Sequence, residues 1–152
     1  MYTYQKSGRF FAQYADGMET EAVKELRELN VKKVQPSFLG AFFESDMEGL
    51  YRVNYASRVL SRVLAPLLTF DCHSTKYLYQ TARKIGWNDF MTVKTTFAVS
   101  ASVAHSKITH SQYAALILKD AIVDHFRDLT GSRPDVDTIN PDIWFNLHIS
   151  GY

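Results

Sequence analysis

The chain has 152 residues, of which 46% are hydrophobic and 14% aromatic, with seven glycines, four prolines and a formal net charge of +1 at pH 7. This composition excludes a disordered or collagen-like chain, and the charge by itself indicates no polyanionic partner. A single cysteine excludes an internal disulfide framework, and no stretch resembles a membrane-spanning helix or a secretory signal, so we expect a cytoplasmic protein without a membrane partner.

Residues 1–73 are predicted to form a first domain with the element order β-α-β-β-α-β. Residues 10–14 are predicted as a strand, and Asp16 followed by Glu19 is typical of a capping box at a helix start. The elements predicted next are strands at 31–38 and 41–45, a helix from Asp46 to about Leu64, and a strand at 67–73. This order is that of a split βαβ, or ferredoxin-like, domain.

Residues 74–152 are predicted to form a second domain of mixed helices and strands. The elements are a helix near 78–85, a strand at 97–103, a polar loop at 105–110, a helix at 111–129 with Gly131 as C-cap, and a strand at 142–149. A two-stranded sheet is marginal by itself. Either the two domains share one sheet, or strands are missing beyond Tyr152. In the second case the strand at 142–149 has an edge open to self-association.

The charge is unevenly distributed along the chain. Residues 1–50 carry six basic and eight acidic side chains, residues 51–107 carry eight and two, and residues 108–152 carry three and six. A segment of net +6 therefore lies between flanks of −2 and −3. On the predicted helix ending near Leu64, one face combines aromatic and basic side chains: Tyr51, Tyr55, Arg58 and Arg62. This face suits a nucleic-acid backbone with splayed bases, and a solvated surface or an interdomain interface explains it as well.

The loop before the long helix contains Lys107 among serine, threonine and histidine residues. Backbone amides at a helix start, the helix dipole and a fixed cation together bind anions such as phosphate. Plain capping by Ser111 is the alternative, which explains the serine but not Lys107. Arg133 follows the C-cap Gly131, where a cation complements the helix dipole, so we expect a structural role for it unless it faces the side of Lys107.

Motifs for catalysis are absent from the sequence. It lacks the glycine-rich nucleotide-binding patterns and the nucleophile elbow, and its five histidines have no metal-ligand spacing. Cys72 and His73 are adjacent on a predicted strand, so their side chains point to opposite faces. An enzyme acting on small molecules is therefore the least supported function.

Several segments together resemble one family. The pieces Ser111-Gln-Tyr-Ala, Lys119-Asp-Ala-Ile-Val-Asp124, Arg133-Pro-Asp-Val-Asp137 and Pro141-Asp-Ile143 look like the THUMP region of bacterial large-subunit ribosomal RNA guanine-N2 methyltransferases. Upstream, Ala15-Asp-Gly-Met-Glu19 and the run from Ser57 to Pro66 are similar to the ferredoxin-like domain that precedes THUMP in those proteins.

The resemblance implies an RNA-binding module that docks structured RNA, with large-subunit ribosomal RNA as the expected partner. Such a module presents a base to a downstream methyltransferase domain that uses S-adenosylmethionine. The RNA-binding residues carried over near the long helix are Ser106, Lys107, Ser111, Lys119 and Arg133. Arg58 and Arg62 match the pattern of the first domain, where they contact RNA or pack between domains.

The chain departs from this family at its end. Family members continue with further THUMP strands and a Rossmann-like domain carrying an Asn/Asp-Pro-Pro-aromatic motif, whereas Asn140-Pro141-Asp142 lacks the second proline and the aromatic residue. We therefore expect an α+β chain cut within THUMP, with no catalytic residue, metal or cofactor of its own. S-adenosylmethionine is implied only for the missing domain. The alternative function is a protein-interaction or oligomerisation module without RNA binding, because tyrosine and arginine are also enriched at protein interfaces.

Overall fold

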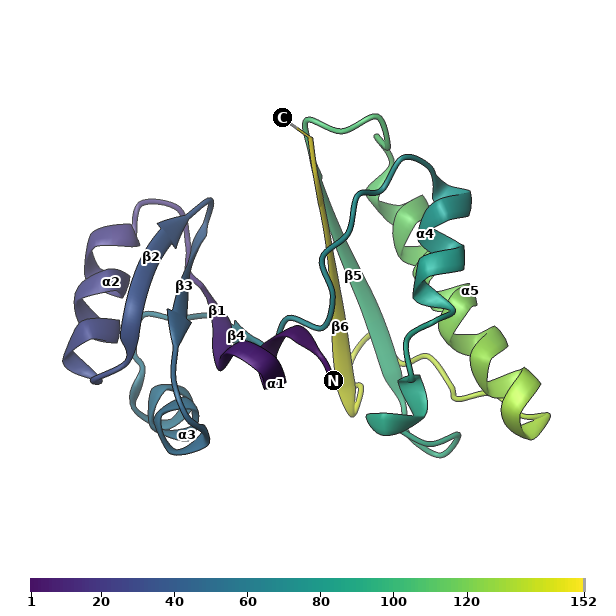
Figure 1. The fold of residues 1–152 in the computed structure, drawn as a ribbon, viewed down its shortest axis with the longest axis horizontal. Helices are drawn as coiled ribbons and strands as arrows, with labels where there is room; N and C mark the ends of the chain where they lie inside the picture. Colours follow the sequence, from purple (N-terminus) through teal and green to yellow (C-terminus); the bar gives the residue numbers. More distant parts are fainter. Residues whose placement is uncertain (152) are drawn as a thin grey trace. The chain divides into compact units, whose positions relative to one another are not determined.

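The computed structural model describes residues 1–151 and divides into two compact units, Met1–Phe70 and Asp71–Tyr152 (Figure 1). Tyr152, the last residue of the predicted second domain, lies outside the described residues. The first unit has a four-stranded antiparallel sheet and the second a two-stranded parallel sheet, each with helices. The predicted α+β class is therefore confirmed. Among the described residues, no helix combines the length and apolar character needed to cross a membrane.

The first unit has the predicted β-α-β-β-α-β order after a short N-terminal helix. Its elements are α1 (Thr3–Ser7), β1 (Arg9–Gln13), α2 (Glu19–Glu28), β2 (Lys32–Ser37), β3 (Gly40–Glu44), α3 (Met47–Ala56) and β4 (Arg62–Leu64). The strands lie in the order β2-β3-β1-β4, and every neighbouring pair is antiparallel. This is the ferredoxin-like arrangement.

One face of this sheet and two helices enclose the core of the first unit. Phe10 and Phe43 point from β1 and β3 to the side where Leu26 of α2 and Val53 of α3 pack, and all four are at most 3% exposed. The opposite face carries the half-buried Phe42, whose ring lies 4.1 Å from the Arg9 guanidinium carbon. The alternation of buried residues along β1 follows from the period of two of a strand.

The predicted helix from Asp46 to Leu64 is wrong in its second half. Its start is confirmed, because the Gly49 N–H donates to Asp46 Oδ1 at 2.8 Å. The helix ends at Ala56 because the Glu25 carboxylate of α2 accepts from the Ser57 hydroxyl at 2.5 Å and from the Arg58 N–H at 3.0 Å. The chain then turns back to form β4 beside β1.

The predicted strand at 67–73 is also wrong, since β4 takes its place in the sheet. The carbonyl groups of Pro66 and Leu67 instead accept the N–H groups of Tyr4 and Thr3, at 3.0 and 3.1 Å. The first N–H groups of a helix lack partners within the helix. The 66–67 segment therefore supplies hydrogen-bond acceptors for the first N–H groups of α1.

The capping box predicted at Asp16 is absent. The N-cap of α2 is Met18, whose side chain makes no capping hydrogen bond, and Gly17 occupies the left-handed region at φ 82°. The chain enters α2 through a turn in which the Met18 N–H donates to the Ala15 carbonyl. A left-handed residue between Asp16 and the helix changes the geometry that a capping box requires.

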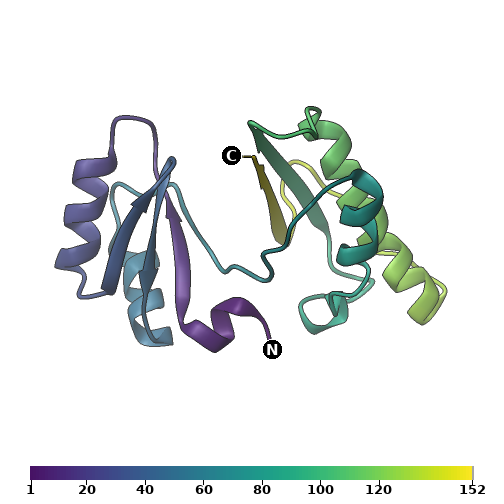
Figure 2. The ribbon, with the colours of Figure 1, turned by 45° about the horizontal axis from the view of Figure 1, so that its top comes forward.

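The second unit places its helices on one face of a parallel strand pair. Its elements are α4 (Thr75–Ala82), the 3₁₀ helix η1 (Trp87–Asp89), β5 (Phe97–Ala104), α5 (Ser111–Thr130) and β6 (Ile143–Ser150). The strands pair in register from Phe97↔Ile143 to Ala104↔Ser150. Both views show α4 and α5 on the same side of the strands (Figures 1 and 2).

The core of the second unit lies between the strands and these two helices. Leu78 of α4 and Ile122 and Phe126 of α5 are at most 1% exposed, and they face the side of the sheet that carries Phe97 and Phe145. The predicted C-cap is confirmed, with Gly131 at φ 76°. Within residues 1–151, β6 is hydrogen-bonded to β5 alone among the strands.

Candidate nucleic-acid interface

The loop between β5 and α5 presents Lys107 to solvent. Ile108 beside it is only 8% exposed and anchors the loop in the core, while the Ser106 hydroxyl accepts the Ile108 N–H at 3.1 Å. The end of β6 also holds the loop, because the Gly151 N–H donates to the Ala104 carbonyl at 2.8 Å. A Cβ at Gly151 would lie 1.6 Å from the carbonyl oxygen of His105, so only glycine permits this approach. Lys107 thus extends from a fixed turn.

The start of α5 lies directly after this loop. Ser111 is the first helical residue and His110 is the N-cap, so the alternative in which Ser111 caps the helix is wrong. The His110 side chain makes no capping hydrogen bond either. The helix therefore presents N–H groups of its first turn near Lys107, over a shallow surface hollow lined by residues 109–113 and Leu116.

Lys119 lies two turns into α5, and its charge is paired. Its Nζ lies 2.5 Å from Asp120 Oδ1, and its side chain is 26% exposed. An ammonium group already paired with a neighbouring carboxylate contributes less to anion binding than a solvated one. Lys107 makes no ion pair among residues 1–151, so it is the stronger candidate.

Arg133 lies at the other end of α5 from Lys107. The helix has 20 residues, which at 1.5 Å per residue separates its ends by about 30 Å. Arg133 Nε donates to the carbonyl of Pro134 at 3.4 Å, and the side chain is half-buried. The structure therefore does not bring Arg133 to the side of Lys107, and its position fits the structural role of a cation beyond a helix C-terminus.

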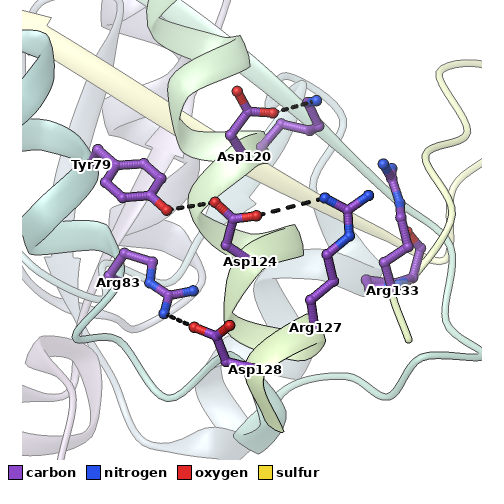
Figure 3. Close-up of polar contacts among 9 residues, drawn as sticks. Tyr79, Arg83, Asp120, Asp124, Arg127, Asp128 and Arg133 are labelled. Atoms are coloured by element: carbon purple, nitrogen blue, oxygen red, sulfur yellow. Dashed lines mark hydrogen bonds and ion pairs between the residues drawn. The ribbon is translucent and has the colours of Figure 1, made fainter. Parts of the chain in front are cut away.

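A polar network joins α4 to α5 along the exposed side of their contact (Figure 3). The Tyr79 hydroxyl donates to Asp124 Oδ2 at 2.5 Å, and Arg83 pairs with Asp128. Arg127 approaches the second oxygen of Asp124 at 3.7 Å. The carboxylate of Asp124 raises the pKa of Tyr79 through this hydrogen bond, and Asp128 raises the pKa of the Arg83 guanidinium in the same way.

This network was not predicted from the sequence, although its spacing is visible there. Tyr79 and Arg83 are four residues apart at the end of α4, and Asp124 and Asp128 are four apart on α5. Residues four apart lie on the same helix face. A tyrosine and an arginine four residues apart on one helix match two aspartates four residues apart on another helix that runs in the same direction. This matched spacing is the sequence signal for a polar contact between the two helices. The arginines of the network pair with the aspartates of α5 and offset their negative charge. The network is best explained as a structural link between the helices.

The predicted face of Tyr51, Tyr55, Arg58 and Arg62 does not form as a helical face. Tyr51 and Tyr55 lie on α3 and are 68% and 94% exposed. Arg58 and Arg62 follow the end of α3, Arg58 in the connecting segment and Arg62 in β4. Both arginines are exposed and belong to the first unit. The tyrosines and arginines therefore do not share one helical face.

Two observations concern the side chains that catalysis or metal binding would use. Burial raises the pKa of the Cys72 thiol, which keeps it protonated and weakens it as a nucleophile. Within residues 1–151, no three histidine, cysteine, aspartate or glutamate side chains gather as metal ligands would.

Comparison with known proteins identifies both units. Residues 72–151 match the THUMP domain family, and residues 9–64 match the RlmL ferredoxin-like domain. A ribosomal RNA large subunit methyltransferase K/L from Syntrophotalea carbinolica is 41% identical over 141 residues, which cover 93% of this chain and 20% of that protein. A putative RNA methyltransferase from Synechocystis is 38% identical over 140 residues, covering 92% of this chain and 36% of that protein.

A solved structure shares the fold. The crystal structure of a predicted N6-adenine-specific DNA methylase from Listeria monocytogenes has a TM-score of 0.75 at 23% identity. The match covers 96% of this chain and 38% of the Listeria protein. The chain thus spans between a fifth and two fifths of the length of these relatives.

Proposed function

Because the chain belongs to the THUMP domain family and carries a ferredoxin-like domain of the RlmL type, we propose that it is the RNA-binding module of an S-adenosylmethionine-dependent ribosomal RNA methyltransferase. Its role is to dock structured RNA, with large-subunit ribosomal RNA as the partner and a guanine N2 atom as the methylation site of the whole protein. We expect it to act in the cytoplasm. The names of the Syntrophotalea and Synechocystis relatives support this proposal.

The observation that carries the proposal is the position of Lys107 beside the start of α5. A cation on an anchored loop and the N–H groups of a first helical turn without a side-chain cap form a site for one phosphate group. Ser106 and Ser111 lie on either side of Lys107 in the sequence and supply hydroxyl groups near it. We rank Lys107 first, Lys119 second and Arg133 last as RNA contacts.

We propose that methyl transfer and its methyl donor belong to a catalytic domain of the whole protein rather than to these two units. The two sheets are a four-stranded antiparallel sheet and a parallel pair, and neither is a doubly wound parallel sheet. In the Asn140-Pro141-Asp142 segment, the Asn140 N–H donates to Asp137 Oδ1 at 3.0 Å within a turn.

The test is a binding titration of the chain with a hairpin RNA at several salt concentrations. Lys107→Ala should weaken binding and lower the salt slope by about one, because one phosphate contact releases about one counterion. Lys84→Ala, which removes an exposed lysine of the same unit, is the matched control and should leave the slope unchanged. Absence of RNA binding at low salt, or binding without a salt dependence, would contradict the proposal.

A second candidate function rests on α3. Met47, Tyr51 and Tyr55 recur every four residues along this helix and are all more than half exposed. A row of large exposed side chains of this kind is typical of a protein interface. In a protein-interaction or oligomerisation module, Tyr51→Ser/Tyr55→Ser would abolish an oligomer seen by sedimentation and leave RNA binding intact. The β6 edge gives a second route to self-association.

A further inference from the structure

The open face of the β5–β6 pair carries a ladder of polar side chains. Alternate residues point away from the helices: the even-numbered residues of β5 and β6, from Ala98 to Ala104 and from Trp144 to Ser150. Ala98 is only 1% exposed, so the accessible part of this face on β5 begins at Ser100. Two cross-strand hydrogen bonds fix this face. Ser100 Oγ donates to Asn146 Oδ1 at 2.7 Å, and Ser102 Oγ lies 2.7 Å from His148 Nδ1.

The ladder holds its members in position before any ligand arrives. The Ser102 contact fixes the His148 ring and occupies Nδ1, while the described residues give Nε2 no hydrogen-bond partner. Trp144 lies on the same face of β6, two residues before Asn146, and is 44% exposed. Trp144 and His148 are four residues apart, or about 13 Å along the strand. Side chains fixed in advance lose less conformational freedom on binding.

The chemistry of this face distinguishes it from an ordinary solvated surface. Parallel strands are usually covered on both faces, yet in this unit α4 and α5 lie on one side only (Figures 1 and 2). None of the even-numbered residues that form the open face is charged. A neutral face with an exposed indole and fixed hydrogen-bonding groups matches the flat face and polar edge of a nucleobase. Apart from Trp144, this face carries no large apolar side chain.

The charged part of the same ligand has a place at the end of the strands. The strands are parallel, so Ala104 and Ser150 end side by side, and the loop with Lys107 begins there. A single strand of nucleic acid has a negative backbone and uncharged bases. A cationic loop at the end of a neutral polar face complements both parts.

We propose that the open β5–β6 face binds unpaired nucleotides of the RNA, with one base stacked on Trp144 and another hydrogen-bonded to His148. This inference rests on the proposed RNA-binding function and adds to it the class of RNA segment that is recognised. The Lys107 loop holds a phosphate group at the carboxyl end of the strands, and the ladder reads the bases next to it.

The experiment compares two RNA probes on the same chain. One is a blunt duplex of two RNA strands without a loop, and the other is the same duplex with a single-stranded 3′ extension of about eight nucleotides, within the range that one single-strand site covers. Trp144→Ala should weaken binding of the extended probe about 5- to 100-fold, since base–aromatic stacking has this effect when the ring is removed. Binding of the blunt probe should change less than about twofold.

The matched variants are Trp144→Phe, which keeps an aromatic ring and should retain most of the affinity, and Ile139→Ala. Ile139 is 92% exposed in the same unit, so its removal tests for a general effect of losing an apolar side chain. A second readout is tryptophan fluorescence, which the extended probe should quench. The quenching should disappear in Trp144→Phe, because the remaining Trp87 is only 2% exposed.

The outcomes separate this inference from the proposed function. If Lys107→Ala weakens both probes while Trp144→Ala weakens neither, the RNA-binding function stands and the inference is overturned. If the unmodified chain binds neither probe, both are overturned. If the chain sediments as a dimer that Trp144→Ala dissociates, the face belongs to a second copy, which also overturns the inference.

Discussion

The sheet of the first unit has four strands and the sheet of the second has two, and the two are stabilised differently. In the first unit, side chains from β1, β3, α2 and α3 meet in one apolar core, and the ion pairs of this unit lie outside it. In the second unit, the strand pair depends on α4 and α5 for its cover, and Tyr79–Asp124 and Arg83–Asp128 link those helices.

This difference shows how a small sheet obtains its stability. A strand pair alone is marginal in water and needs further strands or a packed helix. The first unit has two further strands. Its four-stranded sheet packs against α2 and α3, so apolar burial provides most of its stability. The second unit adds a helix pair, so the contact between α4 and α5 becomes part of what holds the sheet. We expect mutations to separate these two cases in magnitude and in the unit affected.

The largest effect is expected from Phe43→Ala in the first unit. Phe43 is fully buried, and removal of a buried phenylalanine side chain costs about 3–5 kcal/mol of unfolding free energy. Both tryptophans, Trp87 and Trp144, lie in the second unit. Urea unfolding should therefore show a lower midpoint by circular dichroism and an unchanged midpoint by tryptophan fluorescence.

Phe38→Ala is the control for this prediction, because Phe38 is 73% exposed and its removal should leave both midpoints in place. Equal shifts of both midpoints in Phe43→Ala would mean that the two units unfold together, and the comparison between them would lose its basis.

An intermediate effect is expected from Tyr79→Phe in the second unit. The variant loses the hydrogen bond to Asp124, and hydrogen bonds to charged groups contribute about 1.5–3 kcal/mol, less at partly exposed sites. The fluorescence midpoint should fall, while Tyr113→Phe, which removes the hydroxyl of a tyrosine that is 53% exposed, should leave it unchanged. An unchanged midpoint in Tyr79→Phe would show that apolar packing alone holds α4 on α5.

The contribution of Tyr79 also has a defined pH dependence. Its pKa is raised above the ordinary value of 10.0, so the folded state holds this proton more tightly than the unfolded state. The stabilisation is therefore complete below pH 10 and is lost as the pH rises through the folded-state pKa. The midpoint difference between the unmodified chain and Tyr79→Phe should narrow above pH 10. A difference that stays constant would contradict the raised pKa.

The smallest effect is expected from Glu28→Gln on α2. Lys24 Nζ and Glu28 Oε1 are 3.9 Å apart and both side chains are well exposed, so their ion pair contributes about 0.5 kcal/mol or less. The circular dichroism midpoint should hardly move, and a difference of more than about 1 kcal/mol would contradict the view that ion pairs contribute little to the first unit.

The sequence predicted the elements whose signals are local. The Asp46 N-cap, the Gly131 C-cap and the strand at β5 each depend on a few neighbouring residues, and all three appear in the structure. The burial along β5 does not alternate, because Phe97 and Ala98 are both buried. The end of α3 depends on Glu25, 32 residues before Ser57, and a periodic pattern does not contain that information. Leu60 and Leu64 fit the helical period, but their segment pairs with β1 or packs on the core.

The candidate site shows the same limit. The association of Lys107 with a helix start was predictable because the two are adjacent in the sequence. The separation of Lys107 from Arg133 follows from the length of the long helix, which the sequence also predicted. The pairing of Lys119 with Asp120, which weakens Lys119 as an RNA contact, appears only in the structure. The polar ladder joins residues 46 apart, so no local pattern indicates it.

That separation of 46 residues also affects how the chain acquires its structure. Every pair of the β5–β6 ladder spans this distance, whereas β2 and β3 meet across a turn at Ser37↔Gly40. Loop closure costs more entropy for distant partners, and contacts of high sequence separation slow folding. We expect the β2–β3 hairpin to form early and the β5–β6 pair to form late, after α5 is in place. The surface proposed to read bases is therefore among the last parts of the molecule to be assembled.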